Sequence, residues 1–398
     1  MFKTYKTNIL LIFTSILVAL YLCEAFLTIN QNKKTLAYKI KIYKKKTGLD
    51  YDLRSMIEIY NDEKKIDNNV TIRYSPKVLL KHNIKLSNDL YPLSGISNSK
   101  TIHCNEEGYY SKFYSDRYGF NNPDKVWKNS NVNAIFIGGS FTFGDCVNRP
   151  NDIPSVIRDK TASNIINLGY RGNGPLVKYA TLREYFVKGT KNIVWIYYEN
   201  ALDVLKKEKE SQILNKYLLD RNFSQNLIFR QNEIDKANKE LIDYLYNINL
   251  EVDSLKQHKK DMNKKNRILK FIRFDSIKTL IKNYSNKKIN IEKELPFDYF
   301  QEILGEVKNF ADMNNSNLYF VYMPSVINFN NKNFENNNFL KIKDIITNLN
   351  IEFVDLKDDL FNDFKDPLKY YTFRIGPHLN IQGYKEAALK IIESANLK

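Results

Sequence analysis

The sequence predicts an α/β protein with a parallel sheet covered by helices on both faces and an apolar helix at the N-terminus. One observation supports the sheet, and a second predicts an insert in it. From residue 131 onward, short apolar runs of strand length alternate with helical stretches, and strands in this arrangement form parallel sheets that are buried on both faces. One interval between two such runs is about 115 residues long. Because this is too long for a crossover, it predicts a helical insert.

The first element along the chain is an apolar stretch from Asn8 to Asn30, which contains one charged residue, Glu24. Its length is about the twenty residues that a helix needs to cross a bilayer. No small-residue cleavage site follows it, so we favour an uncleaved anchor over a signal peptide. Seven lysines after the stretch would keep the next domain in the cytoplasm, whereas an anchor at the extreme N-terminus usually carries its domain outward.

The formal net charge of +16 is concentrated in two segments. Residues 1–49 hold nine lysines against one glutamate, and residues 201–290 hold twenty lysines and arginines against twelve acidic residues. The rest of the chain is therefore neutral. Basic blocks of this kind more often meet anionic lipid or polymer than read bases. No nucleic-acid-binding motif accompanies them, and we expect no nucleic-acid partner.

The chain is predicted to have three parts: an anchor at residues 1–30, a juxtamembrane and N-terminal extension at residues 31–114, and an α/β domain at residues 115–398. An insert at about residues 203–295 is predicted to be helical, because apolar residues recur there at spacings of three, four and seven. It is either a subdomain packed over the sheet edge or a basic lid or membrane-binding surface. The predicted strands lie at residues 133–138, 164–168, 192–198, 318–323 and 351–354, with helices at 175–186, 339–349 and 381–395.

Four short stretches place glycine or polar residues next to the ends of predicted strands or ahead of the final helix. They are GGSFTFGDCV with Ser140, the glycine-rich NLGYRGNGP, WIYYENALD with Asn200, and GPHLNIQGY with His378. Ligands of open parallel sheets bind at the carboxyl ends of the strands. A serine becomes a nucleophile when a nearby base such as histidine removes its proton, and N–H groups with an asparagine amide can stabilise an oxyanion. Together the stretches predict an acyl-transfer site.

The remaining histidines and cysteines indicate neither a metal nor a cofactor. His103 lies beside Cys104, but no third ligand is nearby in the sequence, and no CxxC motif or Cys/His cluster occurs. Cys104 and Cys146 would be able to pair in a domain outside the cytoplasm. The sequence leaves this open, because it does not show whether the two Cα atoms are close.

In this order, the four stretches resemble the sequence blocks of the SGNH/GDSL hydrolases, a family of serine esterases and acyl transferases with a flavodoxin-like α/β/α fold. The resemblance covers roughly residues 115–398 and is greatest to membrane-anchored bacterial members, whose blocks are similar to RYGFNNP, GGSFTFGDCVN, NLGYRGNGPL, LREY, WIYYEN and HLNIQGY. It implies that Ser140 is the nucleophile and that its own N–H, Gly172 and Asn200 form the oxyanion hole. It also implies that His378 is the general base.

The sequence departs from the family pattern at three acids. The family's Gly-Asp-Ser is Gly-Gly-Ser at Ser140, and its Gly-Asn-Asp is Glu-Asn-Ala at Asn200. The acid two or three residues before the histidine is replaced by an Ile-Gly pair. Some other group must orient His378. We expect a nearby backbone carbonyl or the carboxylate of Asp366 or Asp355 to do so.

The residues and the resemblance together predict a membrane-anchored enzyme that hydrolyses an ester or transfers an acyl group, expected to be acetyl, on an envelope carbohydrate or another ester. Hydrolysis and transfer use the same residues, so both stay open. The missing acids favour one alternative, a catalytically degenerate domain that binds a glycan or a partner. Another is a basic lipid-surface scaffold built on residues 256–290. Envelope chemistry favours a periplasmic or extracellular domain over the cytoplasmic orientation that the lysines indicate.

Overall fold

A computed structural model of the chain contains two compact units. Unit 1 comprises Met1–Tyr51 and Tyr246–Glu294, and unit 2 comprises Asp52–Leu245 and Leu295–Lys398. The predicted extension at residues 31–114 is therefore divided, because its part from Asp52 onward packs with the α/β domain. The structure describes residues 2–32, 36–75, 77–82, 84, 90–288, 295–330 and 337–397.

Unit 2 is built around a five-stranded sheet in which every strand is parallel to its neighbours. The strand order, β5-β4-β6-β7-β8, is the 2-1-3-4-5 order of flavodoxin-like doubly wound folds. The predicted fold class, an α/β fold with a parallel sheet, is confirmed, and each predicted strand is present. The strands are β4 (Ala134–Gly138), β5 (Ile165–Asn167), β6 (Asn192–Tyr198), β7 (Asn317–Met323) and β8 (Glu352–Asp355).

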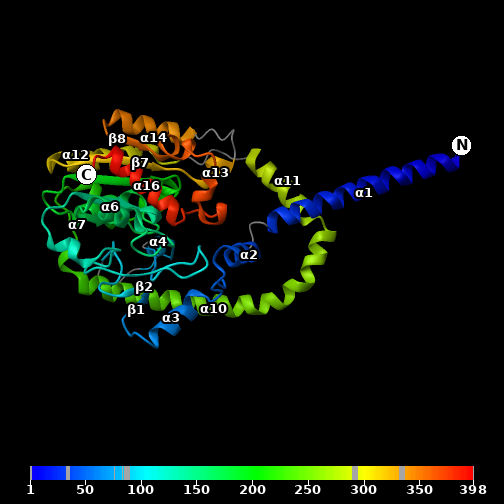
Figure 1. Ribbon diagram of the computed structural model, residues 1–398, viewed down its shortest axis with the longest axis horizontal. Coiled ribbons are helices and arrows are strands. Elements are labelled where there is room, and N and C mark those ends of the chain that lie inside the picture. Colours follow the sequence, from blue (N-terminus) through cyan, green and yellow to red (C-terminus); the bar gives the residue numbers. More distant parts are fainter. Residues whose placement is uncertain are drawn as a thin grey trace. The chain divides into compact units, whose positions relative to one another are not determined.

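Neighbouring side chains along the central strands pack on opposite faces of the sheet, as the two-residue period of a strand requires. Ile135 and Trp195 belong to a core that includes α7, α12 and α14, whereas Phe136 and Val194 pack with α6 and α16. All four side chains are fully buried. Figure 1 shows the strands between these helices, which are α6 (Ile153–Thr161), α7 (Pro175–Tyr185), α12 (Phe297–Met313), α14 (Asn337–Asn348) and α16 (Ile381–Ser394).

The part of unit 2 before β4 forms a small sheet in the order β1-β2-β3. β1 and β2 are parallel, and β2 and β3 are antiparallel. Val70 and Ile102 from this sheet belong to the same core as Ile135, so the small sheet packs onto the α/β domain. The loop between β2 and β3 contributes to the site described below. The elements are α3 (Met56–Lys64), β1 (Val70–Ile72), α4 (Lys77–His82), β2 (Lys100–Ile102) and β3 (Lys112–Tyr114).

The insert predicted at about residues 203–295 is helical where the structure describes it. It contains α8 (Ala201–Glu208), α9 (Gln212–Leu219), α10 (Gln231–Ile272) and α11 (Asp275–Lys288). In the part of α10 that belongs to unit 2, Ile234 and Leu241 are buried, as the predicted apolar stripe requires. The insert also contains the short η2 (Leu227–Phe229). Short helices elsewhere are α5 (Ser140–Phe143), α13 (Val326–Asn330), α15 (Leu356–Asp359), η1 (Asp124–Lys128), η3 (Phe361–Asp363), η4 (Pro367–Tyr370) and η5 (Thr372–Arg374).

Unit 1 contains the predicted anchor, α1 (Phe2–Asn32), together with α2 (Leu36–Thr47). The 22-residue segment Asn8–Ile29 of α1 is long and apolar enough to cross a membrane. Glu24 in this segment is buried, and its carboxylate accepts hydrogen bonds from the N–H groups of Ser276 (2.9 Å) and Ile277 (3.0 Å). These N–H groups lie in the first turn of α11, where they lack partners within the helix. The one charge of the apolar segment therefore joins α1 to α11, and Figure 1 shows α11 meeting α1 near the C-terminal end of α1.

Glu24→Ala should loosen the first turn of α11, because it removes the acceptor for two backbone N–H groups. We expect the amides of Ser276 and Ile277 to exchange with deuterium roughly five to thirty times faster, the range that the loss of a helix cap produces. The measurement is hydrogen–deuterium exchange on the full chain in lipid nanodiscs. Leu22→Ala is the matched control on the same helix. Equal exchange in Glu24→Ala and the control would contradict this role.

Candidate active site

Ser140 begins α5, two residues after the end of β4. The turn requires glycine at position 138, because a Cβ atom on Gly138 would lie 1.8 Å from Oγ1 of Thr142. Ser140 is partly exposed. Within the described part of the chain its backbone N–H has no hydrogen-bond acceptor, as is common in the first turn of a helix. The turn therefore presents both a hydroxyl and an N–H group at the carboxyl end of the sheet.

His378 lies in the loop before α16 and is buried. Its carbonyl accepts hydrogen bonds from the N–H and the hydroxyl of Thr372, each at 3.1 Å, and these bonds fix the loop. The Nε2 atom of the imidazole lies 2.9 Å from Oγ of Ser140. The ring of Phe141 packs against the imidazole, with the two centroids 5.2 Å apart. The structure thus brings together the predicted serine and histidine, which are 238 positions apart in the chain.

The other ring nitrogen of His378, Nδ1, faces a residue that sequence reasoning missed. Nδ1 lies 3.0 Å and 2.9 Å from the two carboxylate oxygens of Glu106. A carboxylate at this position favours the tautomer that carries its hydrogen on Nδ1, which leaves Nε2 free to accept the serine proton. Glu106 belongs to the loop between β2 and β3. One feature of the sequence could have pointed to Glu106, namely Cys104, two residues earlier. Pairing of Cys104 with Cys146 would bring this loop close to Ser140.

Neither acid that we expected to orient His378 hydrogen-bonds to it, and this expectation is corrected by Glu106. Both carboxylate oxygens of Asp366 bind the guanidinium of Arg374, at 2.7 Å and 2.9 Å. The carboxylate of Asp355 caps α15 and accepts the N–H of Lys357 at 3.0 Å. Each aspartate therefore has a local partner of its own.

A second carboxylate, that of Asp145, faces the serine side of His378 and is fully buried. Its Oδ2 atom lies 3.5 Å from Nε2 of His378 and 2.9 Å from Nη1 of Arg171. Its Oδ1 atom lies 2.9 Å from Nε2 of His103. Burial raises the pKa of Asp145, but His103, His378 and Arg171 outweigh burial and bring its pKa well below the usual range. Burial lowers the pKa of His103 to about 4, so His103 is neutral and Asp145 is ionised at neutral pH.

The two carboxylates set the basicity of His378. Burial by itself lowers the pKa of this imidazole, but the charges of Asp145 and Glu106 stabilise the imidazolium and raise the pKa above its ordinary value. A histidine in this setting accepts a proton readily, and its protonated form is stabilised once the proton has moved. The arrangement suits a base that acts on the hydroxyl of Ser140.

Gly172 lies in the turn after β5 with a φ of +84°, a left-handed conformation that favours glycine. Its N–H has no acceptor among the described residues. The N–H of Tyr170 donates to the carbonyl of Gly138 at 3.2 Å, which places this turn beside the end of β4. The buried carboxylate of Glu208 accepts the N–H of Gly174 at 2.6 Å and holds the start of α7 in place. The turn thus carries this N–H group beside the end of β4, the strand that Ser140 follows.

Asn200 immediately precedes α8 and follows the end of β6, at the same edge of the sheet. Its side chain does not cap that helix, and the residue is exposed. Among the described residues, no hydrogen bond joins Asn200 to Ser140 or His378. The third predicted oxyanion donor therefore lies at the expected edge of the sheet without a hydrogen bond to the serine–histidine pair among the described residues.

Cys104 and Cys146 form a disulfide with their Cα atoms 5.1 Å apart, so the pairing that the sequence leaves open does occur in the structure. Both cysteines are buried. A sulfur in a disulfide no longer offers the thiolate that binds a metal ion. The described residues contain two groups with metal-ligand spacing, each of which includes one of these cysteines and so keeps fewer than three ligands. The groups are His103, Cys104 and Asp145, and Glu106, Cys146 and His378.

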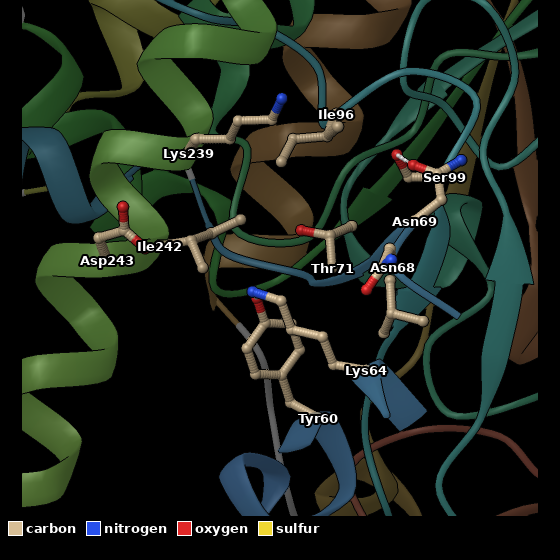
Figure 2. A pocket seen from close by; sticks show the side chains of 11 residues that line it. Tyr60, Lys64, Asn68, Asn69, Thr71, Ile96, Ser99, Lys239, Ile242 and Asp243 are labelled. Atoms are coloured by element: carbon tan, nitrogen blue, oxygen red, sulfur yellow. Dashed lines mark hydrogen bonds between the residues drawn. The ribbon is translucent and has the colours of Figure 1, made fainter. Parts of the chain in front are cut away.

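A cavity of about 280 Å³ lies elsewhere in unit 2. Figure 2 shows that its lining side chains come from α3, from the segment around β1, from the segment before β2 and from α10, and that they include Tyr60, Ser99 and Lys239. Its volume is close to the lower end of the range for small-molecule sites, about 300 Å³. Ser140, Glu106 and His378 do not line it, so the cavity is separate from the serine site.

No protein-family model matches the chain, and no curated protein matches it. Among solved structures, the chain is similar to one assigned to the G-D-S-L family of lipolytic proteins, from Desulfitobacterium hafniense DCB-2. The two sequences are 13% identical, and the match covers 66% of this chain and 99% of the other, with a TM-score of 0.34. So distant a likeness carries no argument about function, and the fold class follows from the strand order described above.

The titration of His378 tests the geometry of the site without any substrate. The chain has four histidines, so their ring signals can be resolved by NMR after selective labelling. We expect the pKa of His378 to lie above the ordinary value of about 6.5. Glu106→Gln and Asp145→Asn should each lower it by about one pH unit or more, because each removes a negative charge that stabilises the imidazolium.

The control for this titration is Asp366→Asn, which should leave the pKa of His378 unchanged because Asp366 is paired with Arg374. His103 should remain neutral throughout, in keeping with its pKa of about 4. A pKa of His378 that does not change in Glu106→Gln would contradict the contact between the two side chains.

Proposed function

We propose that the chain is a serine-dependent esterase or acyltransferase of the SGNH/GDSL type. The observation that carries this proposal is the chain of contacts from Glu106 through His378 to Ser140 at the carboxyl end of the sheet. In this order, the base takes the proton of the hydroxyl, whose oxygen becomes the nucleophile, and the acid stabilises the protonated base. The 2-1-3-4-5 strand order and the family-like sequence blocks around these residues add support.

In the first half of the reaction, Oγ of Ser140 attacks the carbonyl carbon of the ester while Nε2 of His378 takes the hydroxyl proton. Negative charge then develops on the former carbonyl oxygen. The N–H groups of Ser140 and Gly172, which lack acceptors among the described residues, are suited to bind this oxyanion. The carbon–oxygen bond to the leaving alcohol breaks, His378 returns its proton to that alcohol, and the acyl group remains on Ser140.

In the second half, a hydroxyl group attacks the acyl-enzyme. His378 takes its proton, the bond to Oγ breaks, and the proton returns to Ser140. Water as the attacking group gives hydrolysis, and a sugar hydroxyl gives transfer. The same residues serve both outcomes. The resemblance to membrane-anchored family members favours an acyl group, expected to be acetyl, on an envelope carbohydrate.

We further propose that α1 anchors the chain in a membrane and that unit 2 faces the periplasm or the exterior. Support comes from the apolar segment Asn8–Ile29 and from the disulfide between Cys104 and Cys146, because disulfides persist in oxidising compartments and are rare in the cytoplasm. The alternative of a degenerate binding module is weakened by Glu106, which can take the part of the missing acid.

Reaction with a fluorophosphonate probe tests the proposal. The hydroxyl oxygen of Ser140 should form a bond to phosphorus as fluoride leaves, and the proton should pass to His378. We expect the full chain in detergent to be labelled at Ser140, and Ser140→Ala and His378→Ala to lose labelling to the level of heat-denatured protein. Ser163→Ala is the matched control and should be labelled like the unmodified chain.

Two results would contradict the proposed function. One is labelling that persists in Ser140→Ala. The other is a folded chain that does not react at all, which would favour the binding module instead.

A further inference from the structure

We propose that the disulfide between Cys104 and Cys146 is a positioning element of the active site, which holds Glu106 against His378. The inference rests on the proposed function, because it concerns the acid that orients the catalytic base. It assigns to the two cysteines a role in catalysis as well as in stability, although neither sulfur touches the reacting atoms.

The disulfide joins the two segments that the site must bring together. Cys104 lies two residues before Glu106, in the loop between β2 and β3, and Cys146 lies six residues after Ser140. Consecutive Cα atoms are 3.8 Å apart, so the Cα atom of Glu106 cannot lie more than about 8 Å from that of Cys104. The Cα atoms of the two cysteines are 5.1 Å apart. The covalent bond therefore confines the acid to the neighbourhood of the serine segment.

The loop that carries Glu106 is held by hydrogen bonds of its own and by contacts with the segment after Ser140. The N–H of Ser111 donates to the carbonyl of Cys104 at 2.9 Å, and the N–H of Gly108 donates to the side chain of Asn105 at 2.9 Å. The side-chain amide of Asn105 donates to the carbonyl of Asp52 at 2.8 Å. These bonds set the shape of the loop. Toward the segment after Ser140, the N–H of Lys112 donates to the side chain of Asn148 at 2.9 Å, and Nε2 of His103 lies 2.9 Å from Oδ1 of Asp145. The disulfide adds a covalent link between the same two segments, and of these contacts it lies nearest to Glu106 in the sequence.

The acid needs this support because its side chain is long. Glutamate has three side-chain torsions to fix, and ordering them costs free energy. The carboxylate of Glu106 is partly open to solvent, at 15% exposure, so water can compete for it. Misplacement of a positioning group by about 1 Å can cost roughly a hundredfold in rate. A loop released from Cys146 would present the carboxylate in many geometries, of which few orient His378.

The test compares the full chain in the Cys23→Ser background with and without Cys104→Ser/Cys146→Ser. Removing Cys23, the free cysteine in α1, leaves the disulfide pair as the only cysteines. Free thiols in the denatured, unreduced protein then report whether the bond has formed, with none expected. The rate of fluorophosphonate labelling at Ser140 is measured as a function of pH. We expect removal of the disulfide to slow labelling roughly 10- to 100-fold and to move the acidic limb of the pH profile downward, as Glu106→Gln does.

A double-mutant cycle separates positioning from a general loss of structure. In the Glu106→Gln background the disulfide has no acid left to position, so its removal should change the rate by less than about twofold. If the double serine variant does not fold, the folded Cys23→Ser protein is reduced with a phosphine and assayed with its thiols alkylated. Cys23→Ser alone is the control and should react like the unmodified chain.

Two outcomes would overturn the inference. The first is a labelling rate and pH profile that do not change when the disulfide is removed or reduced. The second is an equal loss of rate with and without Glu106, which would assign the disulfide a structural role only. Both require an unmodified chain that reacts at Ser140, whereas absence of that reaction would instead count against the proposed function.

Discussion

The site depends on one hydrogen-bonded arrangement, the imidazole of His378 held between the hydroxyl of Ser140 and the carboxylate of Glu106. The three residues come from three regions of unit 2: the turn after β4, the loop before α16 and the loop between β2 and β3. A different structural feature fixes each of these regions. A glycine turn fixes the serine, hydrogen bonds from Thr372 fix the histidine loop, and a disulfide ties down the loop that carries the acid.

Positive charges close by offset the negative charges beside the imidazole of His378. Two carboxylates, those of Glu106 and Asp145, favour the imidazolium. Arg171 contacts Asp145. Burial lowers the pKa of Arg73 to about 10 while attraction to Asp145 opposes the change, so Arg73 stays protonated at neutral pH. Buried carboxylates without such partners would be costly. The two arginines offset the negative charge of the carboxylates that raise the pKa of the buried His378.

The strands and the serine–histidine pair could be predicted because their signals are local. Each predicted strand agrees with the structure to within one residue at either end, since apolar runs between turn residues are legible in a single sequence. Ser140 and His378 were found because each lies in a recognisable turn next to such an element.

Glu106 could not be found in this way. It follows a strand of three residues, which is too short to show a period, and it meets His378 across 272 positions. The two acids that we expected, Asp366 and Asp355, precede His378 by 12 and 23 positions. Their carboxylates, however, already have local partners in Arg374 and in the first turn of α15. Proximity along the chain was a poor guide to the acid, because the contact depends on a disulfide whose formation the sequence alone does not show.

An experimental structure of the full chain with a fluorophosphonate bound at Ser140 tests the central claim most directly. We predict that a phosphoryl oxygen will lie within hydrogen-bond distance of the N–H groups of Ser140 and Gly172. The Nδ1 atom of His378 should meet the carboxylate of Glu106 beside an intact disulfide. A bound adduct with Glu106 turned toward solvent, or with His378 oriented by a different acid, would contradict the account.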